Sequence, residues 1–178
     1  MLAYVVAAPT RMPVIIGLFA LLLVATVATR RWAWVALAAL GPALAITLTE
    51  LVGKPLTDRG RGGHLLYPSG HMTALVAVIT VAYVLLTTGK LSRYRVMIGL
   101  TWLAGTVIAA TGLIGKREHF FTDTVGGVLV SVGAVLITAT ILDAVANRGV
   151  MKGHWWRQEV PHGSPTPHGV FRAEHEIR

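Results

Sequence analysis

Long apolar runs, nearly free of charged residues, set the strongest limit on how this chain can fold. Five of them, separated by short polar stretches, cover about residues 13–29, 32–51, 71–88, 96–115 and 119–142. A helix rises ~1.5 Å per residue, so roughly 20 apolar residues cross the ~30 Å core of a bilayer. Charged residues make up only 13% of the sequence, whereas ~25% is typical of soluble domains. The sequence therefore predicts an all-α, polytopic membrane helix bundle with about five transmembrane helices.

The composition changes after the last apolar run. We expect a transmembrane domain over residues 1–145 and a polar, partly disordered tail over residues 146–178. The tail contains four histidines whose irregular spacing does not indicate a metal site; they are His154, His162, His168 and His175. Cysteine is absent, which excludes disulfides and thiolate chemistry. The net charge of +8 does not indicate nucleic-acid binding, because no base-stacking aromatic residues interleave with the basic ones.

The basic residues divide unequally between the two ends of the predicted bundle. One end carries Arg11, Lys54, Arg59, Arg61, Lys116 and Arg117, and the other carries Arg30, Arg31, Lys90, Arg93, Arg95, Arg148, Lys152 and Arg157. The positive-inside rule makes the second end cytoplasmic. We therefore predict a multi-pass protein of the cell membrane with a cytoplasmic tail. Because the spans alternate in direction, the polar stretches 54–61, 68–71 and 119–123 all reach the other, extracytoplasmic end.

The third of these stretches holds a histidine and an acid that suit catalysis. His119 and Asp123 are four residues apart, so on a helix they share one face, one turn apart. A carboxylate in that position can fix the imidazole tautomer and leave the other nitrogen free as nucleophile or base. An acid inside an apolar span is a functional candidate by default. The alternative is an interfacial histidine beside an acid that is merely hydrated.

The second stretch, Pro68-Ser69-Gly70-His71, stands at the start of a predicted helix. Free backbone N–H groups and the positive end of the helix dipole attract phosphate there. Gly70 allows close backbone approach, the Ser69 hydroxyl can cap the helix or donate to an anion, and His71 can protonate a leaving oxygen. The alternative is an ordinary capped span with an interfacial histidine.

The first stretch supplies cations. Lys54 and Arg61 belong to a polar loop over residues 53–67 that is rich in Gly and Arg, and they can hold the non-bridging oxygens of a phosphate. The alternative is that they are snorkelling interfacial charges. Glu50, one turn before Lys54, is placed to pair with it.

The order and spacing of these residues resemble the three signature motifs of the type 2 phosphatidic acid phosphatase superfamily, K-x6-R-P, P-S-G-H and S-R-x5-H-x3-D. The matching stretches are Lys54-x6-Arg61, Pro68-Ser69-Gly70-His71 and His119-x3-Asp123, within about residues 32–140. The resemblance covers most of the apolar part of the chain, and the middle motif is complete.

The resemblance implies a role for each matching residue. His119 would attack phosphorus to form a phosphohistidine, Asp123 would orient it, and His71 would be the general acid. Phosphate would be bound by Lys54, Arg61, Ser69 and the backbone of Gly70. The implied chemistry needs no metal or other cofactor, which agrees with the few carboxylates in the sequence.

The sequence departs from the family pattern in three places. Gly62 stands where the first motif has proline, and Gly112 and Leu113 stand where the third has its Ser-Arg pair. Family members in membranes typically have six spans, and five are predicted here. The lost arginine leaves Lys116, Arg117 and Arg59 as candidate replacements that the motif itself does not assign.

The function expected from these features is an integral membrane phosphatase acting on a lipid phosphate or diphosphate. An isoprenyl diphosphate is favoured, with phosphatidate or phosphatidylglycerol phosphate next. The expected partners are this lipid and the bilayer, and a homo-oligomer is a further possibility. Several small residues in the spans allow close helix contact; they are Gly105, Ala109, Gly126, Gly127, Ser131 and Gly133. The alternatives are a non-catalytic relative that binds lipid phosphates or acts as a scaffold, and a small transporter using His and Asp as a proton relay.

Overall fold

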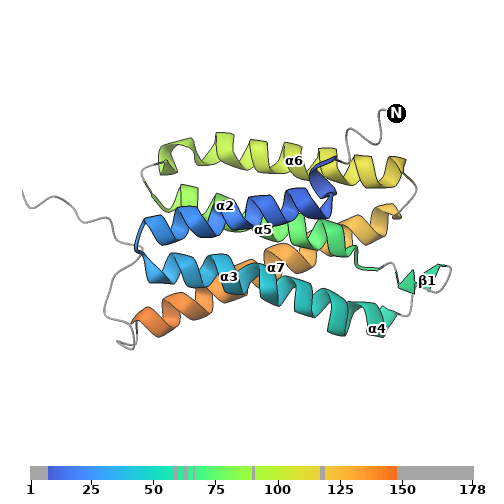
Figure 1. Cartoon of the computed structure of the whole chain (residues 1–178), viewed down its shortest axis with the longest axis horizontal. Coiled ribbons are helices and arrows are strands. Elements are labelled where there is room, and N and C mark those ends of the chain that lie inside the picture. Colours follow the sequence, from blue (N-terminus) through green and yellow to red (C-terminus); the bar gives the residue numbers. More distant parts are fainter. Residues whose placement is uncertain are drawn as a thin grey trace, which may run out of the picture.

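The computed structural model describes residues 8–57, 60–61, 64–65, 67–89, 91–116 and 119–147. Its long helices are α2 (Met12–Ala28), α3 (Trp32–Thr47), α5 (Gly70–Thr87), α6 (Arg95–Gly115) and α7 (Phe121–Asn147), which lie side by side in Figure 1. The shorter elements are η1 (Ala8–Thr10), η2 (Leu48–Gly53), α4 (Lys54–Thr57), β1 (Gly60–Arg61), β2 (His64–Leu65) and η3 (Ser92–Tyr94). The predicted all-α bundle is confirmed, with one addition: β1 and β2 pair as a small antiparallel hairpin.

Among the described residues, four helical stretches are long and apolar enough to cross a membrane. They are Trp32–Thr57, Gly70–Thr87, Ser92–Gly115 and Phe121–Ala146, and the 17-residue α2 is a shorter apolar helix beside them. Large apolar side chains such as Leu21, Val96 and Leu129 are about two-thirds exposed on the outside of the bundle. Exposed apolar surface on this scale is typical of a protein that contacts lipid or a partner. The fold is that of a multi-pass membrane protein.

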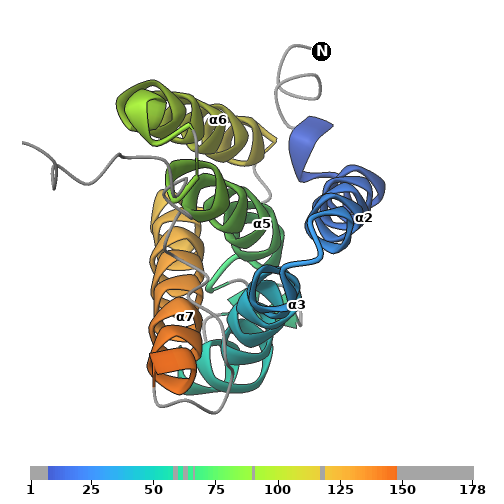
Figure 2. The same ribbon diagram turned by 90° about the vertical axis from the view of Figure 1, so that its left-hand side faces the viewer.

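Helix α5 is the centre of the bundle. The end-on view in Figure 2 shows α2, α3, α6 and α7 arranged around it. Over half of its apolar window is buried (56%), against 22–33% in the other three long spans. Any residue at the start of α5 is therefore held by contacts with several neighbouring helices.

Two apolar clusters pack against α5. The first lies between α3, α5 and α7 and includes Leu37, Val81 and Val135, all fully buried. The second lies between α2, α5 and α6 and includes Met72 and Leu113. Hydroxyl groups link the same helices, since Thr49 Oγ1 donates to Thr73 Oγ1 at 3.0 Å and Trp102 Nε1 donates to Thr80 Oγ1 at 3.0 Å. In an apolar environment such hydrogen bonds add to the packing between helices.

Small residues set the closest helix contacts, though not all those expected. A Cβ at Gly127 would lie 2.9 Å from the carbonyl oxygen of Ser69, and Ser131 and Ala109 are fully buried. Gly105 and Gly133 do not mark helix contacts, because a Cβ at either position would meet nothing within 4 Å. The sequence shows where a small residue stands but not which side of the helix faces a neighbour.

The helix that begins with α3 is longer than predicted. The sequence predicts that the second span ends near residue 51, but η2 and α4 continue the helix to Thr57. The six residues of η2 form a π-helix, whose wider turns appear mostly as short insertions in α-helices and often at functional sites. Pro55 follows this segment, and proline cannot donate the backbone hydrogen bond of a regular helix. The extension places Glu50 and Lys54 on one continuous helix.

Helix α7 also differs from the prediction at both ends. It begins at Phe121, so His119 precedes the helix, and it continues to Asn147 rather than ending near residue 142. The predicted boundary between the transmembrane domain and the tail at 145/146 therefore falls inside α7. The rest of the predicted tail, residues 148–178 with its four histidines, lies outside the described residues.

Candidate functional site

The three polar stretches meet at one end of the bundle. Figure 1 shows α4, the β1–β2 hairpin and the starts of α5 and α7 at the same end, opposite the end where α5 leads into η3. This is the arrangement that the alternating direction of the spans predicts. The contacts below show how closely the stretches approach one another.

Ser69 is the N-cap residue that immediately precedes α5. Its backbone is extended (φ −71°, ψ 114°), and its side chain accepts a hydrogen bond from the backbone N–H of Met72 at 3.5 Å. Its carbonyl oxygen accepts a hydrogen bond from the Thr73 hydroxyl at 2.9 Å. The predicted N-cap is confirmed. Ser69 is completely buried, so its hydroxyl lies just beneath the end of the helix rather than on the surface.

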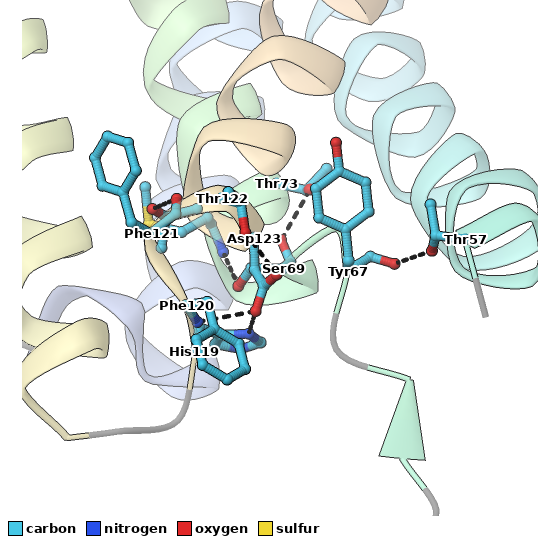
Figure 3. Close-up of polar contacts among 11 residues, drawn as sticks. Thr57, Tyr67, Ser69, Thr73, His119, Phe120, Phe121, Thr122 and Asp123 are labelled. Carbon is cyan, nitrogen blue, oxygen red and sulfur yellow. Dashed lines mark hydrogen bonds and ion pairs between the residues drawn. The ribbon is translucent and has the colours of Figure 1, made fainter. Parts of the chain in front are cut away.

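Asp123 occupies the first turn of α7 and does two things there. Its Oδ2 accepts a hydrogen bond from the backbone N–H of Phe120 at 2.9 Å, which satisfies a donor at the helix start. The same oxygen lies 3.8 Å from His119 Nδ1. Asp123 is fully buried, and the positive end of the α7 dipole favours a negative charge at this place. The acid thus fixes the start of the helix and faces the histidine, as Figure 3 shows.

His119 reaches Asp123 from outside the helix. The expectation that both residues lie on one helical face is wrong, because the Asp123 carboxylate caps Phe120 and the helix begins after it. The His119 side chain is 12% exposed, so one side of the ring reaches the surface of the bundle. The 3.8 Å separation exceeds the ~2.7–3.2 Å of a hydrogen bond, although such contacts in ligand-free sites often tighten when substrate binds.

The second and third stretches are joined directly through their backbones. The Ser69 N–H donates to the carbonyl oxygen of Asp123 at 3.0 Å. One turn further along α7, Gly127 lets the helix approach so closely that a Cβ there would lie 2.9 Å from Ser69 O and 3.2 Å from Thr73 N. The start of α5 and the start of α7 therefore form one packed corner (Figure 3).

The first stretch joins this corner at Gly70. Lys54 Nζ forms an ion pair with Glu50 Oε2 at 2.7 Å, which confirms the predicted pairing. A Cβ at Gly70 would lie 2.9 Å from Glu50 Oε1 and 4.0 Å from Lys54 Nζ. Both charged groups therefore lie against the first residue of α5. A larger residue at position 70 would displace the Glu50 carboxylate, whose side chain is 43% exposed and free to move.

His71 and Lys116 hold positions near this corner. His71 is the second residue of α5 and is partly buried. Lys116 ends α6, where its backbone N–H donates to the carbonyl oxygen of Gly112, and its side chain is partly buried. Both lie at the same end of the bundle as His119.

Leu113 occupies the position where the third motif would have arginine. It is 1% exposed and belongs to the apolar cluster with Met72 and Ala109. This position is part of the packing between α5 and α6 rather than a polar surface. The other candidate cations, Arg59 and Arg117, lie outside the described residues, and Arg61 is described only through its backbone in β1.

Tyr67 and Thr57 are structural members of the site that sequence reasoning missed. The Thr57 hydroxyl donates to the carbonyl oxygen of Tyr67 at 3.1 Å, which ties the end of α4 to the segment before α5. The Tyr67 ring covers Gly126, where a Cβ would lie 2.7–2.9 Å from ring atoms. The adjacent glycines at 126 and 127 were the available signal, since two neighbouring residues without side chains leave space for close contacts, although they do not identify the partner.

Together these contacts gather at one end of the bundle groups whose chemistry suits an anion and a reactive imidazole. Lys54 and the first turn of α5 supply positive charge, and His119 with Asp123 supplies a held imidazole. The described residues contain no group of three or more His, Asp or Glu side chains that could hold a metal ion.

Comparison of this chain with protein-family models, with curated proteins and with solved structures gave no match.

Proposed function

We propose that this protein is an integral membrane phosphatase that hydrolyses a lipid phosphate or diphosphate. The observation that carries the proposal is the junction of the three polar stretches: Ser69 N–H bonds to Asp123 O, and Gly70 lies against Lys54. The stretches are 54–61, 68–71 and 119–123, far apart in the sequence, and they resemble the motifs of the type 2 phosphatidic acid phosphatase superfamily in order and spacing.

In the proposed reaction, His119 is the nucleophile. Asp123 Oδ2 faces Nδ1, which keeps the proton on that nitrogen and leaves the lone pair of Nε2 for attack on phosphorus. A bond forms between Nε2 and phosphorus while the bond from phosphorus to the leaving oxygen breaks. His71 gives its proton to that oxygen. Water then hydrolyses the phosphohistidine, with His71 taking a proton from it, and inorganic phosphate is released.

Groups around the start of α5 would stabilise the negative charge of the transition state. Lys54 and Arg61 hold the non-bridging oxygens, and backbone N–H groups at Gly70 approach them closely. Ser69 is fully buried beneath this turn. Its proposed contribution is to hold the turn as its N-cap, so that the backbone N–H of Gly70 stays in place.

The substrate is proposed to be a lipid because of where the site lies. The corner is at the ends of membrane-length helices, so an apolar tail can enter from the bilayer while the headgroup meets Lys54. An isoprenyl diphosphate is the favoured substrate, followed by phosphatidate and phosphatidylglycerol phosphate. We further propose that the site faces the extracytoplasmic side, since the larger number of basic residues is at the other end.

The deciding experiment is phosphate release from this panel of lipids by the purified full chain, with His119→Ala as control. Release by the wild type, together with an acid-labile phosphoenzyme that His119→Ala does not form, supports the proposal. If no lipid in the panel yields phosphate and no phosphoenzyme forms, the enzyme proposal fails.

A second candidate function is a non-catalytic protein that binds lipid phosphates. It is favoured by one observation, the burial of Leu113 in an apolar cluster where the family motif has a phosphate-binding arginine. This candidate predicts binding of the same lipids without release of phosphate, so the panel above separates the two.

A further inference from the structure

Glu50 lies where an incoming phosphate is proposed to bind. Its Oε1 would be 2.9 Å from a Cβ on Gly70, the first residue of α5. Its Oε2 pairs with Lys54 Nζ at 2.7 Å. One carboxylate therefore pairs with Lys54 and lies beside Gly70, the two residues to which the proposed function assigns phosphate binding.

The place is one that attracts oxyanions. The first N–H groups of a helix lack partners within the helix, and the helix dipole is positive there. A carboxylate resembles part of a phosphate in one respect, because both bring negatively charged oxygens to a lysine and to the positive end of a helix. Glu50 is the fourth residue before Lys54 on one continuous helix, so the helix itself holds the two side chains together.

The pair is also able to open. The Glu50 side chain is 43% exposed and that of Lys54 is 22% exposed. Exposed ion pairs between residues four apart on a helix are weak, because solvent screens them. A phosphate dianion carries more charge than a carboxylate and competes well for the same lysine.

We propose that Glu50 is an internal stand-in for phosphate, which holds Lys54 against the start of α5 in the empty site and withdraws when substrate arrives. This inference rests on the proposed function. Glu50 is thus a positioning residue that keeps Lys54 ordered between turnovers. Its negative charge also opposes bound phosphate, so it lowers affinity for the inorganic phosphate product and promotes its release.

The test is the binding of inorganic phosphate to the purified full chain in detergent, measured by titration calorimetry. Glu50→Gln keeps the shape and removes the charge, and it is expected to lower the dissociation constant about three- to tenfold, a change of ~0.7–1.4 kcal/mol. Glu50→Asp keeps the charge on a shorter side chain, and its dissociation constant for phosphate should lie between those of the wild type and Glu50→Gln. Lys54→Gln is expected to raise the dissociation constant about tenfold or more. Asp143→Asn removes one negative charge near the opposite end of α7 and should leave binding unchanged.

Damage to the fold would weaken phosphate binding, so tighter binding by Glu50→Gln is a result that a merely structural role does not give. Equal or weaker binding by Glu50→Gln, in protein that elutes and melts like the wild type, overturns the inference. If the wild type releases phosphate from lipids while Glu50→Gln binds phosphate no more tightly, the proposed function stands and the role of Glu50 falls. If neither protein binds phosphate or releases it from any lipid, both proposals fall.

Discussion

The backbone N–H of Ser69 donates a hydrogen bond to the carbonyl oxygen of Asp123 over 3.0 Å. These residues are at the starts of α5 and α7, and each also caps its own helix, Ser69 through its hydroxyl and Asp123 through its carboxylate. The local signals that begin the two helices are therefore the same groups that join them. The geometry of the candidate site follows from how the helices start.

Replacement of the proposed nucleophile is the most direct test. His119→Ala should remove phosphoenzyme formation and lower phosphate release at least about a thousandfold, as expected when a covalent nucleophile is lost. The measurement is phosphate release together with trapping of the acid-labile intermediate. His162→Ala, in the tail, is the control and should behave like the wild type. Wild-type turnover in His119→Ala would show that a different residue attacks phosphorus.

Asp123 should affect rate and stability separately. Asp123→Asn keeps an oxygen that can accept from the Phe120 N–H but cannot hold the imidazole as a carboxylate does, so kcat should fall about 10²–10⁴-fold with little change in melting temperature. Asp123→Ala also loses the cap, which costs ~1 kcal/mol of stability. The two variants are compared by kinetics and thermal unfolding in detergent. Equal kcat in Asp123→Asn and the wild type would contradict the orienting role.

The close approach of α7 to α5 gives a matched pair of glycine substitutions. Gly127→Ala places a Cβ 2.9 Å from Ser69 O and 3.0 Å from Met72 Cβ, and overpacking of this kind typically costs ~1–3 kcal/mol. Gly133→Ala lies on the same helix with nothing within 4 Å and should be neutral or stabilising, because alanine favours helix more than glycine by ~1 kcal/mol. The melting temperature and the rate of phosphate release should both fall in Gly127→Ala, and neither should fall in Gly133→Ala. Equal melting temperatures in the two variants would show that α7 does not lie this close to Ser69.

Placing at position 113 the arginine of the motif that the sequence resembles should not strengthen the proposed site. Leu113→Arg puts a charge into an apolar cluster at a position that is 1% exposed, and an unpaired buried charge costs several kcal/mol. We expect less folded protein and lower phosphate release, whereas Leu113→Met, which nearly conserves volume, should be tolerated. The yield of monodisperse protein and its activity are the measurements. Higher activity in Leu113→Arg would mean that this position faces the phosphate.

The absence of cysteine makes the orientation of the protein measurable. Single cysteines at Leu56 and Leu91 lie near opposite ends of the bundle, on side chains that are 79% and 41% exposed. With the site outside the cytoplasm, a membrane-impermeant maleimide should label Leu56→Cys on intact cells and Leu91→Cys only after permeabilisation. The reverse pattern would place the site on the cytoplasmic side.

Much of the fold could be predicted from the sequence because apolar runs of membrane length leave few alternatives. The pairing of Glu50 with Lys54 and the cap at Ser69 were also predictable, since both depend on residues three or four apart. Helix ends were less predictable. The helix beginning with α3 passes its predicted end through a π-helix before Pro55, and α7 starts after His119 because Asp123 caps Phe120.

The contacts between helices could not be read from one sequence. Positions 127 and 133 are both glycine and lie on the same helix, yet of the two only Gly127 packs against a neighbouring helix. In the sequence, Leu113 stands where the motif that the chain resembles has arginine, but only the packing shows that the residue lies in an apolar cluster. Local signals decide where helices begin, whereas the side of each helix that faces its neighbours depends on how all the helices pack together.

The hydrogen bond from Thr57 Oγ1 to Tyr67 O joins two residues ten positions apart. It fixes both ends of the segment between them, so the distance from Lys54 to Ser69 does not depend on how many residues lie in that segment. Lengthening a surface connection costs little, because the entropy of closing a loop grows slowly with its length. Sequences of different length could therefore be exchanged in this segment while α4 and α5 remain in register, provided that Arg61 is kept for the proposed phosphate site.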